Sequence, residues 1–167
     1  KGGVGYAKAA GNYAGSFYPT SLAIEKGFDQ IVWTDSVNHK LIEEAGTMNI
    51  FFRINNKLIT PKHTDTILDG VTRKSVITVA KDSGIDLEIR DIEVSEIIQE
   101  YENGNLTEVF GAGTAAVIAP ISSFGYKGKK YILKDIDDAF GPIIKKKIVD
   151  IQNNLTEDKY NWRYQVI

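Results

Sequence analysis

The start of the chain places a lysine among small residues, where it could do covalent chemistry. Lys8 lies within Gly-Gly-Val-Gly-Tyr-Ala-Lys-Ala-Ala-Gly-Asn-Tyr-Ala-Gly, residues 2–15. Glycine and alanine allow a ligand to approach the backbone closely, and they offer the amine no carboxylate, so we expect it to lose its proton readily. An uncharged lysine can form a Schiff base with a carbonyl group. Taken alone, the segment fits a glycine-rich loop with one solvated lysine better.

A second segment places carboxylates in an apolar, extended stretch. Residues 42–51 read Ile-Glu-Glu-Ala-Gly-Thr-Met-Asn-Ile-Phe. An unpaired buried carboxylate is costly, so each must reach solvent or a cation. Because successive side chains of a strand point to opposite faces, only one of Glu43 and Glu44 should point inward. The alternative is that Glu44 is an ordinary solvated strand residue.

Two further segments could bind phosphate through backbone N–H groups. Residues 67–73, Ile-Leu-Asp-Gly-Val-Thr-Arg, form a loop entering a predicted helix, whose N-terminus favours anions. Residues 110–116, Phe-Gly-Ala-Gly-Thr-Ala-Ala, offer a second turn of backbone donors. Each is weak alone, because such glycines usually mark only turns. Neither matches the nucleotide phosphate-binding loop, and the dinucleotide fingerprint fails because Lys8 stands where its third glycine belongs.

The composition excludes several classes of protein. The chain has 167 residues, 43% hydrophobic and 25% charged, which suits one globular domain over residues 1–167. A net charge of −2 argues against a nucleic-acid partner. There is no cysteine, and His39 and His63 alone do not suggest a zinc site. Because no apolar run approaches the ~20 residues of a membrane span, we expect no membrane partner and a cytoplasmic location.

Periodicity and turn residues predict alternating helices and strands, hence an α/β domain with a mixed sheet. Gly27 should end the first helix, Ser95 should cap the third, and Pro142 should lie in the first turn of the last. The predicted helices span 12–26, 71–82, 95–102 and 142–152. The predicted strands span 30–34, 41–54 with a break at Gly46, 57–60 after an Asn55-Asn56 turn, 86–92, 108–110, 115–118 and a hairpin over 124–133.

In their order along the chain and in their residues, the four segments resemble those of the branched-chain amino acid aminotransferases, pyridoxal-phosphate enzymes of fold type IV. Lys8 lies within Gly-Gly-x-Gly-x-x-Lys-x-x-x-Asn-Tyr and Glu44 within Glu-x-Gly-Thr-Met-Asn-Ile-Phe. Residues 67–73 match Ile-Leu-x-Gly-Val-Thr-Arg, and the pattern Glu-Val-Phe-Gly-x-Gly-Thr-Ala is found within residues 108–116. The resemblance covers nearly the whole chain. The sequence Gly-Thr-Met-Asn favours this family over the D-amino acid aminotransferases and aminodeoxychorismate lyases.

This resemblance implies the family's larger, cofactor-bearing domain, a mixed-sheet pseudo-barrel with surrounding helices. The expected activity is transfer of amino groups from leucine, isoleucine and valine to 2-oxoglutarate through lysine-bound pyridoxal 5′-phosphate. The family's N-terminal domain, which supplies an arginine to the cofactor phosphate and part of the pocket, would be missing here. The family also implies a homodimer or a larger assembly.

The resemblance assigns a role to each matching position. Lys8 would be the Schiff-base lysine and would move the substrate proton, and Glu44 would pair with the pyridine nitrogen. Tyr13 would hydrogen-bond the phenolic oxygen, and Leu68 would pack on the ring face. The phosphate would be bound by Val71, Thr72 and Thr114, and the substrate carboxylate by Thr47 and Ala115.

Two departures and three alternatives accompany this interpretation. Asp69 stands where the family usually has proline, so its charge must point away from the phosphate or cap the helix. Ala116 and Ala119 stand where some animal members carry a redox cysteine pair, which excludes such a switch. The alternatives are an inactive structural fragment, another fold type IV activity, and a phosphate-binding module without chemistry. The mass of the purified protein compared with that of 167 residues would identify a fragment, and the yellow colour of bound cofactor would argue against a phosphate-binding module.

Overall fold

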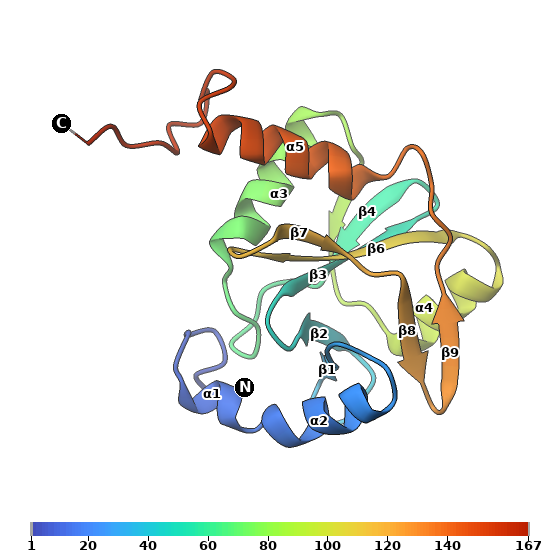
Figure 1. Cartoon of the computed structure of the whole chain (residues 1–167). Coiled ribbons are helices and arrows are strands. Elements are labelled where there is room, and N and C mark those ends of the chain that lie inside the picture. The colour runs from blue at the N-terminus through green and yellow to red at the C-terminus, as the bar shows by residue number, and fades with distance from the viewer. Residues whose placement is uncertain (1, 167) are drawn as a thin grey trace.

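A five-stranded sheet with strand order β5-β4-β3-β6-β7 lies at the centre of the molecule (Figure 1). The computed structural model describes residues 2–166. Neighbouring strands are antiparallel except β4 and β5, which are parallel, so the predicted mixed sheet is confirmed. The strands are β3 (Asn49–Ile54), β4 (Lys57–Thr60), β5 (Leu87–Ile89), β6 (Leu106–Gly113) and β7 (Val117–Pro120).

Two antiparallel ribbons accompany the sheet. One pairs β1 (Val32–Thr34) with β2 (Ile42–Ala45), and the other pairs β8 (Ser123–Tyr126) with β9 (Lys129–Ile132). The predicted Asn55-Asn56 turn joins β3 to β4, and both residues have positive φ, 49° and 63°. This geometry matches the twist of a two-residue hairpin, and asparagine tolerates it better than most residues do.

The helices follow the predicted pattern with two corrections. The helix expected over 12–26 is interrupted and forms α1 (Gly11–Ala14) and α2 (Phe17–Glu25). The helix α4 (Val94–Glu102) has Glu93 rather than Ser95 at its N-cap, and the Ser95 hydroxyl donates to Glu93 Oε2 at 2.8 Å. The remaining helices are α3 (Val71–Asp82) and α5 (Phe140–Gln152), and Pro142 lies in the first turn of α5 as expected.

Strand β3 is buried on both faces and forms the middle of the core. Phe51 packs with side chains of α3 and α5, while Ile50 and Phe52 pack on the opposite side with Ile97 of α4. Figure 1 shows α3 and α5 on one side of the sheet and α4 on the other. Phe51 lies directly opposite Phe110 of β6, and their rings stack with centroids 5.1 Å apart. The turn from β2 into β3 therefore ends on a strand that the core holds in place.

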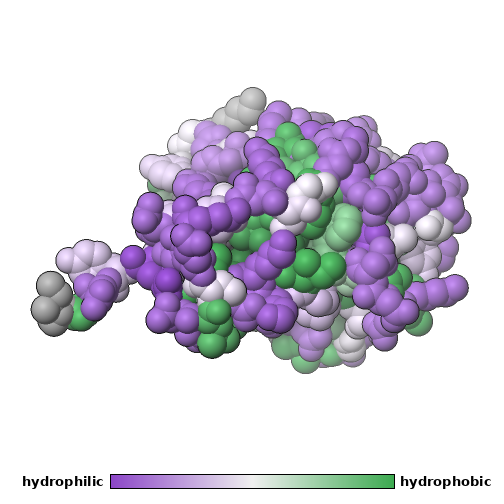
Figure 2. Space-filling view, turned by 90° about the horizontal axis from the view of Figure 1, so that it is seen from above, coloured by the Kyte–Doolittle hydropathy of each residue, from purple (hydrophilic) through white to green (hydrophobic). Residues whose placement is uncertain are grey.

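The surface is uneven in polarity. Viewed from above, it is mostly hydrophilic, with hydrophobic residues gathered toward its middle (Figure 2). Helix α2 has no buried residue, and Phe17 and Tyr18 are 75% and 72% exposed. Within residues 2–166, no helix has the length and apolar character needed to cross a membrane.

Candidate active site

One cleft of about 220 Å³ collects residues from distant parts of the chain. It lies between the Lys8 loop, the turn from β2 to β3, the N-terminus of α3 and the end of β6. Ala115 is the only predicted site residue that does not line it; this residue is exposed in the turn between β6 and β7. The predicted residues that do line the cleft are Lys8, Tyr13, Glu44, Thr47, Leu68, Val71, Thr72 and Thr114.

Lys8 lies at the edge of the cleft on a loop held by a few hydrogen bonds. Asn12 Nδ2 donates to the carbonyl oxygens of Val4 and Ala7, at 2.8 and 2.9 Å, and so closes the loop around the lysine. Lys8 Nζ lies 5.7 Å from the ring centroid of Tyr13. The Lys8 side chain is exposed, so within residues 2–166 the amine is not shielded from water. Glycine and alanine side chains are too small to cover the amine.

Glu44 lies on β2 and lines the cleft, and its carboxylate contacts the loop before α3. Glu44 Oε2 accepts hydrogen bonds from the Leu68 N–H at 3.2 Å and from Asn49 Nδ2 at 3.3 Å. Burial raises the pKa of this carboxyl from 4.5 to about 7; repulsion from Glu43 adds to the rise, and the Leu68 N–H and Lys8 oppose it. Glu43 instead accepts from the Thr66 hydroxyl at 2.6 Å and does not line the cleft.

The N-terminus of α3 forms the part of the cleft expected to bind an anion. Gly70 is its N-cap and makes no side-chain cap, so the N–H groups of the first turn have no partner within the helix. Val71 and Thr72 of this turn line the cleft. Asp69 forms an ion pair with Lys74, which lowers its pKa, and does not cap the helix. The negative charge of Asp69 is therefore partly neutralised by Lys74.

The two glycines at the end of β6 have a different role from the one expected. A Cβ atom on Gly111 would lie 2.6 Å from Met48 Cε, and one on Gly113 would lie 3.2 Å from Met48 Cγ. Both residues also belong to β6, where they pair with neighbouring strands. The two glycines make room for the Met48 side chain. The backbone N–H groups expected to bind phosphate here are therefore limited to the residues after β6, beginning with Thr114.

Three polar residues to which sequence reasoning gave no role stabilise the site. Asn12 closes the lysine loop, and Asn49 contacts Glu44. Gln30 accepts a hydrogen bond of 2.9 Å from the Thr47 hydroxyl. Both asparagines lie within the matching motifs, and this was the one sequence feature that could have indicated their roles. Gln30 lies outside the motifs.

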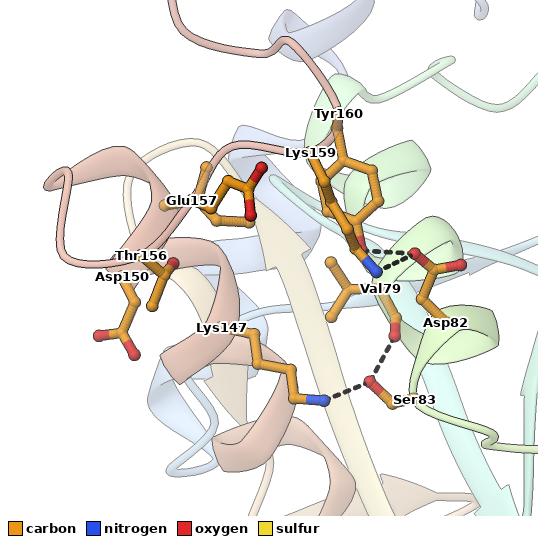
Figure 3. Close-up of a pocket in the computed structure, with 10 residues that line it drawn as sticks. Val79, Asp82, Ser83, Lys147, Asp150, Thr156, Glu157, Lys159 and Tyr160 are labelled. Atoms are coloured by element: carbon orange, nitrogen blue, oxygen red, sulfur yellow. Dashed lines mark hydrogen bonds and ion pairs between the residues drawn. The ribbon is translucent and has the colours of Figure 1, made fainter.

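A second cleft, of about 190 Å³, lies at the opposite end of α3. Figure 3 shows it between the C-terminal end of α3, helix α5 and residues 156–160. Lys159 and Tyr160 both contact Asp82, at 2.7 and 2.8 Å, and Lys147 donates to Ser83 at 2.7 Å. These polar groups are already paired with one another, and none of the predicted site residues lies here.

Comparison with known proteins agrees with the motifs. The family model described as amino-transferase class IV matches residues 5–124. A probable branched-chain-amino-acid aminotransferase from Staphylococcus epidermidis is 44% identical over 170 residues, which cover 99% of this chain and 47% of that protein. The chain therefore spans about half the length of the curated relatives it matches.

Solved structures share the fold. The branched-chain amino acid aminotransferase of Escherichia coli matches with a TM-score of 0.77 and 28% identity, over 96% of this chain and 50% of that one. The branched-chain aminotransferase of Thermoproteus uzoniensis, solved with norvaline, matches with a TM-score of 0.78 and 29% identity, over 95% of this chain and 48% of that one. Because the family model covers most of the chain and every predicted site residue, this chain belongs to the class IV aminotransferases.

Proposed function

We propose that this chain forms the cofactor-binding part of an enzyme that transfers amino groups from branched-chain L-amino acids to 2-oxoglutarate with pyridoxal 5′-phosphate. The observation that carries the proposal is the meeting of the Lys8 amine, the Glu44 carboxylate and the N-terminus of α3 in one cleft. The relatives support the substrate class, since they are branched-chain aminotransferases.

The donor groups of the cleft fit this cofactor. Pyridoxal phosphate has an aldehyde, a basic ring nitrogen and a phosphate, and the cleft offers an amine, a partly buried carboxylate and free helix N–H groups. Burial raises the pKa of Glu44 and Lys8 offsets the rise only in part, so a further positive charge beside it would stabilise its ionised form. A protonated ring nitrogen would supply that charge. When bound, the cofactor supplies an electron sink for negative charge at the substrate Cα.

Each contact would come from a different element. Lys8 would hold the aldehyde carbon covalently, and Glu44 would pair with the ring nitrogen. Tyr13 would donate to the phenolic oxygen, and Leu68 would cover a ring face. The phosphate would be bound at the entrance of α3 and at the end of β6, by Val71, Thr72 and Thr114.

Lys8 would also act as the acid–base group of the reaction. With its amine free, Lys8 Nζ would accept the proton from the substrate Cα as a general base and would then donate it to the C4′ carbon of the cofactor as a general acid. Its loop is exposed, so the amine can change position without disturbing the buried sheet. Glu44 stays in place during these steps because its carboxylate is tied to the base of the cleft.

The substrate carboxylate would lie near Thr47 and Ala115. The Thr47 hydroxyl donates to Gln30, so the contribution of Thr47 would come mainly from its backbone N–H. Ala115 lies one residue beyond Thr114, outside the lining of the cleft. We propose that it contributes its backbone N–H once the turn between β6 and β7 is covered.

The other half of the pocket would come from sequence beyond these 167 residues. Lys8 is exposed and the chain spans about half the length of its relatives. We propose that a further domain covers the cleft and adds a cation for the phosphate, and that two copies or more assemble. The alternative of an inactive fragment follows from the same observations, because water weakens every electrostatic contact in an open site.

The proposal is tested by adding pyridoxal phosphate to the protein, reducing with borohydride and mapping the labelled peptide. Label on Lys8 together with leucine-dependent glutamate formation by the protein combined with its covering domain would support it. Turnover of D-amino acids in place of leucine would favour another class IV activity. Phosphate binding without any label would favour a module without chemistry.

A further inference from the structure

Asn49, the first residue of β3, connects three parts of the cleft. Its side chain is buried, with the residue 5% exposed. Its amide nitrogen donates to the Leu68 carbonyl oxygen at 2.9 Å and to Glu44 Oε2 at 3.3 Å. An amide carries two N–H groups, so it can make both contacts at once. Asn49 thereby ties β3 to β2 and to the loop before α3.

The contacts to Glu44 all fall on one oxygen. The Leu68 N–H also donates to Glu44 Oε2, at 3.2 Å. A carboxylate can accept on both of its oxygens. Holding it through Oε2 leaves Oε1 for a ligand in the cleft. We propose that Asn49 is a positioning residue that fixes Glu44 through Oε2 and so presents Oε1 to the ring nitrogen of the cofactor.

The close packing of Gly70 against the Asn49 side chain is a second observation on the placement of this amide. A Cβ atom on Gly70 would lie 2.1 Å from Asn49 Oδ1. The Gly70 backbone, at φ −64° and ψ 128°, is open to any residue, so conformation does not require glycine here. The atom that a side chain at position 70 would meet is the Asn49 amide oxygen. Glycine before α3 therefore leaves the Asn49 amide room to keep its contacts with Glu44 and Leu68.

This inference rests on the proposed function for the identity of the ligand, but its test needs no cofactor. The carboxyl groups of glutamate are labelled with ¹³C, Glu44 is assigned with Glu44→Gln, and its titration is followed by NMR. The variant Asn49→Leu removes the donor while filling the same space. We expect the proton affinity of Glu44 to rise about three- to tenfold, because its ionised form loses a hydrogen bond.

A matched control separates positioning from general support of the fold. Thr60 is fully buried on β4, and its hydroxyl donates to the Ile50 carbonyl at 2.8 Å. Thr60→Val removes a buried hydrogen bond of the same sheet without touching Glu44. It should lower stability and leave the Glu44 titration unchanged. If Asn49→Leu behaves in the same way, Asn49 is only a structural residue and the proposal is refuted.

Gly70→Ala provides a second route should Asn49→Leu fail to fold. The added methyl group should displace the Asn49 amide and raise the proton affinity of Glu44 in the same direction. In an Asn49→Ala background the conflicting atoms are gone, so Gly70→Ala should then have little effect on the titration. An equal effect in both backgrounds would contradict the inference. Failure of pyridoxal phosphate to bind would refute the proposed function and leave this titration result standing.

Discussion

Replacing Glu44 with glutamine should stabilise the cofactor-free protein at alkaline pH. The pKa of the carboxyl is about 7 in the folded state against 4.5 for an unperturbed group, mainly because of burial. The folded state therefore holds this proton more tightly than the unfolded state does. That contribution is fully present below pH 4.5 and is lost as the pH rises through 7.

The size of the effect follows from the same values. One pKa unit corresponds to about 1.4 kcal/mol, so a rise to about 7 implies a cost of about 3 kcal/mol for the ionised form. Glu44 is only partly buried, so solvent screens its charge, which reduces the expected cost to about 1–2 kcal/mol. Glu44→Gln keeps an oxygen that can accept from the Leu68 N–H but carries no charge. Its stability relative to the unmodified protein should rise by this amount between about pH 5 and pH 8.

The assay is urea unfolding of both proteins at several pH values, with Glu43→Gln as the matched control. The control removes a charge one residue earlier, on a side chain that contacts Thr66 rather than the cleft. Glu44 keeps its titration in this control and loses only a neighbour's repulsion, so most of the pH dependence should remain. A stability difference between Glu44→Gln and the unmodified protein that does not change with pH would refute the reasoning.

Three further results are expected. Borohydride reduction with pyridoxal phosphate should label Lys8, and label on any other lysine found by peptide mapping would overturn that assignment. Glu108→Ala should cost about 2–3 kcal/mol in urea unfolding. Its carboxylate accepts from the N–H groups of Phe140 and Gly141, at 2.8 and 2.7 Å, and an unchanged midpoint would contradict this helix-capping role. The 167 residues alone should form glutamate from leucine far more slowly than when combined with a covering domain, and equal rates would show that the site is complete without one.

Local signals were sufficient to predict much of the fold. The Asn55-Asn56 turn, helix α3 and the break at Gly46 depend on nearby residues, and the structure confirms all three. The helix expected over 12–26 is divided because none of its residues is buried, so packing does not select one continuous helix. Ser95 was a sound cap by residue type, but its hydroxyl contacts the Glu93 side chain.

The candidate site was harder to derive from residue types. Sequence motifs could suggest that Lys8 and Glu44 meet, but the exposure of Lys8 depends on what covers its loop. The need for Gly111 depends on Met48, which approaches from the turn between β2 and β3. Glu108, which belongs to a matching motif, caps α5 rather than lining the cleft. Contacts between distant elements decided each of these outcomes.

The arrangement of the cleft separates a group that must move from groups that must stay. Glu44 is held by Asn49 and Leu68 beside strands buried on both faces, so its position is set by the core. Lys8 lies on an exposed loop closed by Asn12, where a change of side-chain position breaks no core contact. A lysine that alternates between holding a cofactor and moving a proton needs this freedom, whereas a counter-charge for the ring is effective only at a fixed distance. The division between loop and sheet therefore matches the two tasks that the proposed reaction assigns to these residues.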